Sequence, residues 1–180
     1  MKSLRILGVT VAVFVIDQLT KAYIHNTMKL YQSFSVLGDF FRITYIENSG
    51  MAFGIKMGQS SFFTVFALIA SLGILIYLFK MKGEHIVARL SMAMILGGAL
   101  GNLWDRITRG SVVDFFDVEF FDINIPAFKV AFFNFPGYSL DRWPVFNVAD
   151  IAITVGMLML AAVVLFTKEK PAVVETEIIC

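Results

Sequence analysis

Long apolar runs, interrupted at only a few polar positions, dominate most of the chain. A helix needs about 20 apolar residues to cross the roughly 30 Å hydrocarbon core of a bilayer. Four runs meet this requirement, and we predict transmembrane helices at residues 4–23, 61–79, 86–104 and 147–166. Residues 41–46 alternate in polarity and are rich in β-branched and aromatic types, which predicts a strand of a small sheet. The pattern therefore predicts an all-α membrane protein with four transmembrane helices and a small β-sheet.

The placement of Lys and Arg predicts the orientation of these helices, because cytoplasmic segments of membrane proteins are enriched in both residues. Basic residues are dense before the first helix, between the second and third, and after the fourth, and sparse in the two longer connections. We therefore expect both termini on the cytoplasmic side and the sheet on the outer face. Residues 1–167 are predicted to form a single domain, and residues 168–180 a disordered cytoplasmic tail.

The connection before the fourth helix is rich in aromatic residues, which favour the headgroup level of a membrane. The aromatic residues within residues 110–146 include Phe115, Phe116, Phe120, Phe121, Phe128, Phe132, Phe133, Phe135, Tyr138 and Trp143. The acidic residues of this segment that we expect to face solvent are Asp117, Glu119, Asp122 and Asp141. We expect the segment to lie along the outer interface, but its pattern predicts no particular secondary structure.

Composition agrees with a membrane protein and narrows the functional classes. Hydrophobic residues make up 58% of the chain and charged residues 16%, against about 45–50% and about 25% in soluble globular domains. A soluble globular or disordered chain is therefore excluded. The formal net charge of +1 provides no long-range attraction for nucleic acid. The one cysteine, Cys180, permits neither an intramolecular disulfide nor a cysteine-based metal site.

The strongly polar residues in or beside the predicted helices all fall at the outer leaflet. They are Asp17, Lys21, Asn48, Asn102, Asp105, Arg106, Asn147 and Asp150. Residues three or four apart lie on the same face of a helix. The two side chains in each of the pairs Asp17–Lys21, Asn102–Arg106 and Asn147–Asp150 are therefore expected on one face of their helix. A charged carboxylate inside a bilayer costs about 2.5–3.5 kcal/mol on insertion scales, so such residues are functional-site candidates by default.

Several of these residues also have a purely structural interpretation. Asp17 and Lys21 are consistent with an interfacial ion pair whose lysine extends to the membrane surface. Asn147 is suited to cap the fourth helix, a role that is compatible with a functional site. Asp150 is consistent with a structural polar residue near the helix start, although its position inside the span favours a function.

A glycine pair in the third predicted helix bears on how the helices pack. Gly97 and Gly101 are four residues apart, a spacing that lets a neighbouring backbone approach closely. Their position directly before Asn102 predicts that this polar side chain is held against another helix. Asp114 follows in an apolar stretch that returns to the interface, and its spacing alone assigns it no role.

The inventory of reactive residues excludes most hydrolytic and cofactor-dependent sites. The two histidines, His25 and His85, belong to no zinc-binding motif, and the chain has no Gly-x-Ser-x-Gly motif and no phosphate-binding glycine loop. Carboxylates, amides and one arginine remain at the outer site formed by the polar residues of the helices. Two adjacent carboxylates can share one proton, so that one activates water while the other stays protonated. The sequence thus permits an aspartic hydrolase that needs no metal or cofactor, with nearby polar donors for the oxyanion.

Five blocks of residues resemble one bacterial family, the lipoprotein signal peptidases, also called signal peptidase II. The blocks are Asp17-Gln18-Leu19-Thr20-Lys21, Glu47-Asn48-Ser49-Gly50-Met51-Ala52-Phe53-Gly54, Gly97-Gly98-Ala99-Leu100-Gly101-Asn102-Leu103-Trp104-Asp105-Arg106, Val112-Val113-Asp114-Phe115 and Phe146-Asn147-Val148-Ala149-Asp150. They follow the family's order across residues 4–166, and together they are highly specific.

The resemblance implies an intramembrane aspartic endopeptidase of the bacterial inner membrane. It implies cleavage of diacylglyceryl-modified prolipoproteins just before the lipidated cysteine, at the outer leaflet and without a cofactor. Asp114 and Asp150 match the family's catalytic pair. The residues that match the rest of its site are Asp17, Lys21, Asn48, Gly50, Asn102, Arg106 and Asn147. The implied partners are these substrates and membrane lipids, with no nucleic acid, and a monomer suffices for the chemistry.

Two alternatives belong to other classes. A transporter or channel subunit places polar groups near the middle of the membrane and often contains internal repeats, whereas no repeat is visible here. An inactive scaffold with the same fold is the second alternative, and the presence of both Asp114 and Asp150 speaks against it. Met51, Ile151 and the long aromatic stretch 115–143 depart from the family's usual pattern and bear on substrate fit.

Overall fold

Four helices form the body of the protein within the described part of the chain. The computed structural model describes residues 2–49, 60–81, 85–119, 123–130 and 132–167. The helices are α1 (Lys2–Thr27), α2 (Ser60–Lys80), α3 (Ile86–Arg109) and α4 (Val148–Phe166). Each predicted apolar run is therefore confirmed as a helix, with ends that differ by up to a few residues. The predicted tail, residues 168–180, lies outside the described residues.

Length and composition suit three of the described helices for crossing a membrane. These stretches are Arg5–Thr27, Ile86–Arg109 and Val148–Phe166, and α2 contributes the shorter apolar stretch Thr64–Lys80. Large apolar side chains such as Leu158 and Leu165 are exposed on the outside of α4. Lipid tails are as apolar as leucine, so such exposure carries no penalty in a bilayer. The predicted helical membrane fold is confirmed for three spans.

The third helix lies at the centre of the bundle, where it contacts each of the other helices. Glycines allow close approaches between α3 and its neighbours. A side-chain carbon at Gly97 would lie 2.8 Å from the carbonyl oxygen of Thr10 in α1, and one at Gly98 would overlap the carbonyl oxygen of Ala149 in α4. The predicted close approach through glycine is therefore confirmed, and it brings the polar ends of three helices together.

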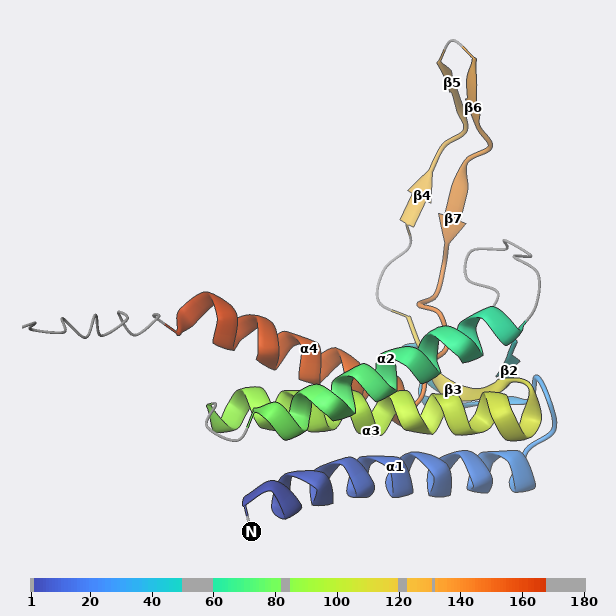
Figure 1. Cartoon of the computed structure of the whole chain (residues 1–180). Coiled ribbons are helices and arrows are strands. Elements are labelled where there is room, and N and C mark those ends of the chain that lie inside the picture. The colour runs from blue at the N-terminus through green and yellow to red at the C-terminus, as the bar shows by residue number, and fades with distance from the viewer. Residues whose placement is uncertain (1, 50–59, 82–84, 120–122, 131, 168–180) are drawn as a thin grey trace, which may run out of the picture.

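Helices α1, α3 and α4 are arranged so that the predicted site residues they carry gather at one end of the bundle. The N-terminal end of α1 lies at the same end as the C-terminal end of α4 (Figure 1). At the opposite end, α3 stops at Gly110, which has φ +79° and donates its backbone N–H to the Arg106 carbonyl oxygen at 3.1 Å. Glycine suits this left-handed C-cap because it has no Cβ. The chain then turns directly into the strand that carries Asp114.

A small antiparallel sheet lies at this polar end (Figure 1). Its strands, in the order β1-β2-β3, are β1 (Ser33–Leu37), β2 (Phe41–Asn48) and β3 (Val112–Val118). The predicted strand at 41–46 is confirmed as part of β2. The register places Ile46 of β2 opposite Asp114 of β3. The side chains of Tyr45, Val113 and Phe115 are buried under the sheet beside Ile24 of α1.

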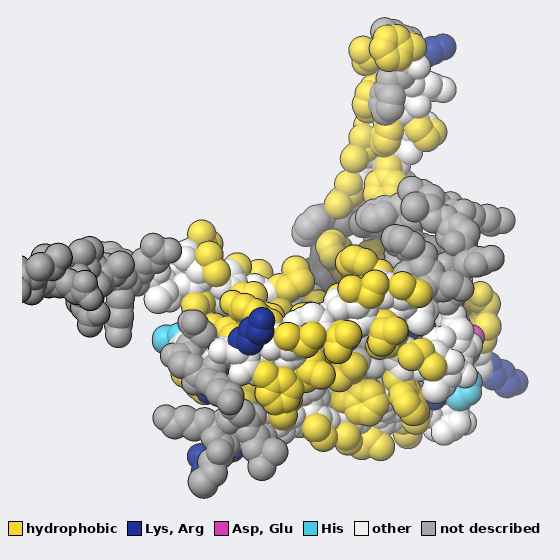
Figure 2. All heavy atoms as spheres, viewed as in Figure 1, with side chains coloured by type: hydrophobic (Ala, Val, Ile, Leu, Met, Phe, Trp, Pro, Cys, Tyr) yellow, Lys and Arg dark blue, Asp and Glu magenta, His cyan; other side chains and the backbone are white. Residues whose placement is uncertain are grey.

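The aromatic connection forms a projection built from two short hairpins, a structure that the sequence pattern did not predict. The first, β4 (Ile123–Ile125) with β7 (Tyr138–Leu140), continues into the second, β5 (Phe128–Val130) with β6 (Phe133–Phe135). We call residues 123–140 the finger. It extends away from the helices (Figure 1) and carries hydrophobic side chains along its length (Figure 2).

Arg142 ties the base of the finger to the sheet. Its Nε donates to the Asp117 carboxylate at 2.7 Å, and its Nη1 also pairs with the Glu119 carboxylate. The same nitrogen donates to the backbone carbonyl of Asp39 at 2.9 Å, and Asp117 accepts a second hydrogen bond from the Thr44 hydroxyl at 2.6 Å. The prediction that Asp117 faces solvent is therefore wrong: it is 6% exposed because the sheet and Arg142 cover it.

Candidate active site

Asp114 and Asp150 reach one site from different elements, β3 and the first turn of α4. Asn147 joins them. Its side-chain Nδ2 donates to Oδ1 of Asp114 at 2.6 Å, and its backbone N–H donates to Oδ2 of Asp150 at 3.1 Å. Asp114 is buried and Asp150 is half-buried. The two aspartates that match the family's catalytic pair are thus held through a single residue.

Asn147 serves this site while it caps α4. Its side-chain oxygen accepts the backbone N–H of Asp150 at 3.0 Å, and the Asp150 side chain accepts the Asn147 backbone N–H in return. This reciprocal pattern satisfies two backbone donors at a helix start. The predicted cap is confirmed. The cap uses only the oxygen of the Asn147 side-chain amide. The nitrogen of the same amide is therefore available to donate to Asp114.

Asn102 connects the aspartates to α3. Its Nδ2 donates to Oδ1 of Asp150 at 2.9 Å. Its Oδ1 accepts from the Lys21 ammonium at 2.8 Å and from the Asn147 amide at 3.2 Å. The expectation that the glycines before Asn102 hold this side chain against another helix is therefore confirmed, and the contact involves both α1 and the start of α4.

Beside the aspartates lies a group of buried side chains that we call the buried polar cluster: Asp17, Lys21, Asn102 and Asp105. The Lys21 ammonium is 2.9 Å from the Asp17 carboxylate and 3.1 Å from the Asp105 carboxylate, and the side chains of all three are 0% exposed. The interpretation of Lys21 as a lysine that extends to the membrane surface is therefore wrong. Its charge is balanced inside the protein.

The carboxylates of this cluster position both elements that carry the aspartates. Asp17 accepts the backbone N–H of Ala149 at 2.9 Å, directly beside Asp150. Asp105 accepts the backbone N–H of Val113 at 3.3 Å, directly beside Asp114. Asp105 stands among the outer polar residues of the sequence but not among those matched to the family's site. It lies three residues after Asn102 on the same helix face, so the rule used for the other pairs would have identified it.

Asn48 and Arg106 complete the group. Asn48 donates its Nδ2 to Oδ2 of Asp114 at 3.1 Å. The guanidinium of Arg106 interacts electrostatically with Asp150 and Asp114, and its Nη1 lies 3.4 Å from the Asn102 carbonyl oxygen that it donates to. Every predicted site residue that the structure describes therefore belongs to one connected set. Gly50 lies outside the described residues.

The environment of Asp114 favours its protonated form. Burial, followed by the nearby charge of Asp150, raises the pKa of Asp114 to about 7. The hydrogen bonds from Asn48 and Asn147 act in the opposite direction, because they stabilise the ionised carboxylate. Asp114 is therefore about half protonated near neutral pH and mainly protonated below it, within reach of the charge of Asp150. A carboxyl group that keeps its proton near an ionised one is the setting in which one can donate a proton while the other accepts one.

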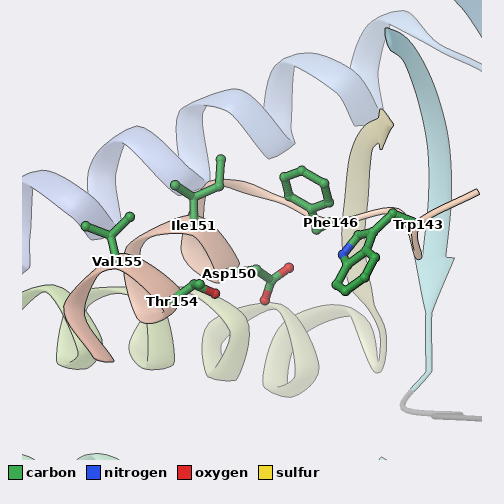
Figure 3. Close-up of a pocket in the computed structure, with 6 residues that line it drawn as sticks. All are labelled: Trp143, Phe146, Asp150, Ile151, Thr154 and Val155. Atoms are coloured by element: carbon green, nitrogen blue, oxygen red, sulfur yellow. The ribbon is translucent and has the colours of Figure 1, made fainter. Parts of the chain in front are cut away.

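Each of the two aspartates lines a cavity. One of about 280 Å³ lies beside Asp150 and is lined by Trp143, Phe146, Asp150, Ile151, Thr154 and Val155 (Figure 3). Another of about 240 Å³ is lined by Ile46, Glu47, Asn48, Ser49, Asp114, Pro144 and Val145. The cavity beside Asp150 has mainly apolar walls, whereas the cavity beside Asp114 has several polar ones. The residues around the cavity beside Asp114 come from three distant segments of the chain, whereas those around the cavity beside Asp150 all lie between residues 143 and 155.

Comparisons with known proteins define the class of this helical membrane protein as a peptidase. A family model described as Signal peptidase (SPase) II matches residues 9–166. The chain belongs to this family. The resemblance drawn from the sequence blocks is confirmed, and the transporter alternative is wrong. Among the described residues, no group of three or more His, Cys, Asp or Glu side chains is placed to hold a metal ion.

Relatives and solved structures cover most of the chain. The lipoprotein signal peptidase of Clostridium acetobutylicum is 34% identical over 167 residues, which are 93% of this chain and 97% of the relative. That of Pseudomonas aeruginosa is 36% identical over 161 residues, which are 86% of this chain and 84% of the relative. A 2.3 Å structure described as a bacterial membrane enzyme has a TM-score of 0.69 and 30% identity, covering 92% of this chain and 93% of that one.

Proposed function

We propose that this membrane peptidase removes the signal peptide from diacylglyceryl-modified prolipoproteins by aspartic catalysis, cutting just before the lipidated cysteine at the outer leaflet. The relatives are named lipoprotein signal peptidases, which supports the substrate class. One observation carries the aspartic mechanism: Asn147 bonds to Asp114 and to Asp150 at the same time.

In this mechanism Asp150 is the base and Asp114 is the proton donor. Both oxygens of Asp150 accept hydrogen bonds, from Asn102 and from the Asn147 backbone, which suits a carboxylate that takes a proton from water. Asp114, with its pKa raised to about 7, holds the proton that the substrate carbonyl needs. Arg106 lies near both aspartates, where its charge stabilises the oxygen that becomes negative.

The proposed reaction proceeds in two proton-balanced steps. The water oxygen bonds to the scissile carbonyl carbon while Asp150 takes the water proton and Asp114 gives its proton to the carbonyl oxygen. The carbon–nitrogen bond then breaks. The leaving amine takes the proton from Asp150, and Asp114 recovers its proton as the carbonyl re-forms. Both carboxyl groups return to their starting states without a metal or another cofactor.

The two cavities suit a lipidated peptide. The apolar cavity beside Asp150 suits an apolar part of the substrate, and the more polar cavity beside Asp114 suits its peptide backbone. One cavity is lined by Asp150 and the other by Asp114, so a substrate that occupies both places its scissile bond near the two aspartates. Trp143 and Phe146 form part of the apolar wall (Figure 3).

We further propose the topology of a four-span protein of the inner membrane. In this topology α2 is the fourth span, and both termini lie on the cytoplasmic side. Lys80 ends α2 at the end of the bundle where α1 begins, away from the sheet (Figure 1). Because basic residues are retained in the cytoplasm, this arrangement supports an outward-facing aspartate pair. A monomer contains the whole proposed site.

The test is a cleavage assay in nanodiscs with a diacylglyceryl-modified prolipoprotein peptide. Asp114→Asn and Asp150→Asn are each expected to lower the cleavage rate by at least about a hundredfold, because either change removes a proton-transfer group. Thermal unfolding establishes that the variants remain folded. Asp39→Asn is the matched control, since this carboxylate is exposed in the turn between β1 and β2.

Each part of the proposal has its own negative result. Full activity in either site variant would refute the aspartate pair. Equal cleavage of the same peptide without its diacylglyceryl group would refute the substrate class while leaving the chemistry intact. Chelators are expected to leave activity unchanged, and loss of activity that added metal restores would point to a different chemistry.

A further inference from the structure

The finger exposes more apolar surface than a water-exposed hairpin tolerates. Phe132 is 101% exposed, Val130 62% and Phe128 47%. The strands of the finger pair with one another, β4 with β7 and β5 with β6. Two-stranded hairpins are at best marginally stable in water, and exposed apolar side chains add a hydration cost. The finger therefore needs an apolar surrounding.

The composition of the finger indicates what this surrounding is. Residues 123–140 include five aromatic residues and a single charged residue, Lys129. Figure 2 shows hydrophobic side chains along the projection and one basic side chain at its end. Aromatic rings favour the headgroup level of a bilayer, and a lysine there is attracted to lipid phosphate. This combination matches the boundary between headgroups and acyl chains.

The direction of the finger agrees with this location. It runs crosswise to the axes of α1 and α3 (Figure 1). Because these helices cross the membrane, a segment perpendicular to them lies along the membrane. At its base, Trp143 donates its backbone N–H to Val118 of β3 at 3.0 Å, and Arg142 is bound to the Asp117 carboxylate. These contacts fix the direction of the finger and keep its base at the polar end of the bundle.

We propose that the finger is an interfacial anchor whose partner is phospholipid of the leaflet nearest the aspartate pair. Phe128, Val130 and Phe132 insert at the boundary between headgroups and acyl chains, and Lys129 lies beside the lipid phosphates. Lipid fits better than a protein partner because the finger is aligned with the membrane that already surrounds the helices. The proposal is independent of the aspartate mechanism, so its failure would leave that mechanism standing.

The experiment measures the depth of the fingertip in full-length protein. Cys180→Ser removes the only native cysteine, and Phe132→Cys accepts an environment-sensitive fluorophore. The protein is placed in nanodiscs of phosphatidylcholine and phosphatidylglycerol with nitroxide-labelled lipids. We expect a large loss of fluorescence with nitroxide near the headgroup, a smaller loss with nitroxide at the acyl-chain end, and little loss with aqueous iodide. Asp39→Cys, in the charged turn between β1 and β2, is the matched control expected to be quenched by iodide.

Three results would overturn the proposal or its parts. Iodide quenching at position 132 equal to that at position 39 would place the finger in water. Protection from both iodide and nitroxide would mean that protein, either a partner or a second copy, covers it. Lys129→Glu is expected to reduce nitroxide quenching in anionic discs but not in discs of phosphatidylcholine alone. An equal effect in both would refute the contact of Lys129 with phosphate.

Discussion

The buried polar cluster holds charged side chains inside the protein, and the finger exposes apolar side chains. This is the opposite of the usual arrangement in a water-soluble protein. The cluster places the side chains of Asp17, Lys21 and Asp105 at 0% exposure, whereas the finger leaves Phe132 fully exposed. In a membrane, polar groups must find partners inside the protein, and apolar side chains face the lipid without penalty. The polar interior therefore positions the site, and the apolar exterior makes contact with the surroundings.

The buried polar cluster and the finger also differ in how strongly the rest of the protein depends on their contacts. The cluster bonds to the backbone of α4 through Asp17 and of β3 through Asp105, so a change there reaches both aspartates. The finger joins the rest of the protein mainly at its base, through Arg142 and its neighbours. We therefore expect substitutions in the cluster to alter stability and activity together, and substitutions at the fingertip to leave the fold intact.

The largest effect is expected from Lys21→Met, which removes the positive charge between two buried carboxylates. Uncompensated buried charges cost about 3–5 kcal/mol when one partner of a buried pair is lost. Unfolding in detergent and the cleavage assay measure the loss of stability and of activity. Lys29→Met is the control because Lys29 is exposed after α1. A Lys21→Met protein as stable and active as the wild type would refute the positioning role of the cluster.

A smaller loss is expected from Gly101→Ala. An added Cβ at Gly101 would overlap the Asp17 carboxylate, which holds the start of α4. Overpacking of this kind costs about 1–3 kcal/mol, and displaced Asp17 lowers activity as well. Gly8→Ala is the matched control, since nothing lies within 4 Å of a Cβ at Gly8. If both variants unfold at the same temperature, the Gly101 contact does not constrain the helix.

The pH dependence of cleavage tests the electrostatics of Asp114. Because its pKa is raised to about 7, the protonated form is present below that pH and is lost as pH rises through it. The value of kcat/KM is therefore expected to fall above about pH 7. In Asn48→Ala, loss of a hydrogen bond that stabilises the ionised form raises the pKa of Asp114 further. The fall should then move to higher pH.

The control for this profile is Thr108→Ala, because the Thr108 hydroxyl bonds only to the Trp104 carbonyl within its own helix among the contacts described. It should reproduce the wild-type pH profile. If kcat/KM instead rises as pH increases through about 7, Asp114 acts in its ionised form, and the roles of the two aspartates would have to be exchanged.

The smallest effect is expected at the fingertip. Phe132→Ser in detergent should change the free energy of unfolding by no more than about 0.5 kcal/mol, as for other exposed substitutions without specific contacts. Leu96→Ala provides the contrast, because Leu96 is 1% exposed in the helical core and such truncations cost about 2–5 kcal/mol. Equal losses in the two variants would mean that the finger packs against the bundle.

The helices were predictable because hydropathy is a local property of the chain, but their ends were less so. The first helix continues to Thr27 rather than residue 23, and the third to Arg109 rather than residue 104. Apolar residues mark where a helix meets lipid, whereas a helix ends where its last carbonyls are capped. For the third helix this happens at Gly110. The finger was not predictable, since three-residue strands depend on their partners more than on their own pattern.

The candidate site was also predictable only in part from the sequence. The residue types and the family blocks identified Asp114, Asp150 and their polar neighbours, but no spacing rule joins Asp114 to Asp150 or reveals the environment of Lys21. Asp117 was misjudged for a related reason: its cover comes from Arg142, 25 residues further along the chain. Burial of a polar residue depends on which segments the fold places around it, and short-range sequence patterns do not contain that information.

The membrane setting, the helices and the set of groups available for chemistry follow from residue type and local periodicity, so they can be predicted from the sequence. Which of these groups meet depends on the tertiary structure. Asp17 reaches the backbone of Ala149 across 132 residues of chain, and Lys21 reaches Asn102 across 81. Hydrogen bonds and ion pairs act over a few ångströms. Their partners are therefore set by the close packing of helices at Gly97, Gly98 and Gly101, which brings distant segments within reach.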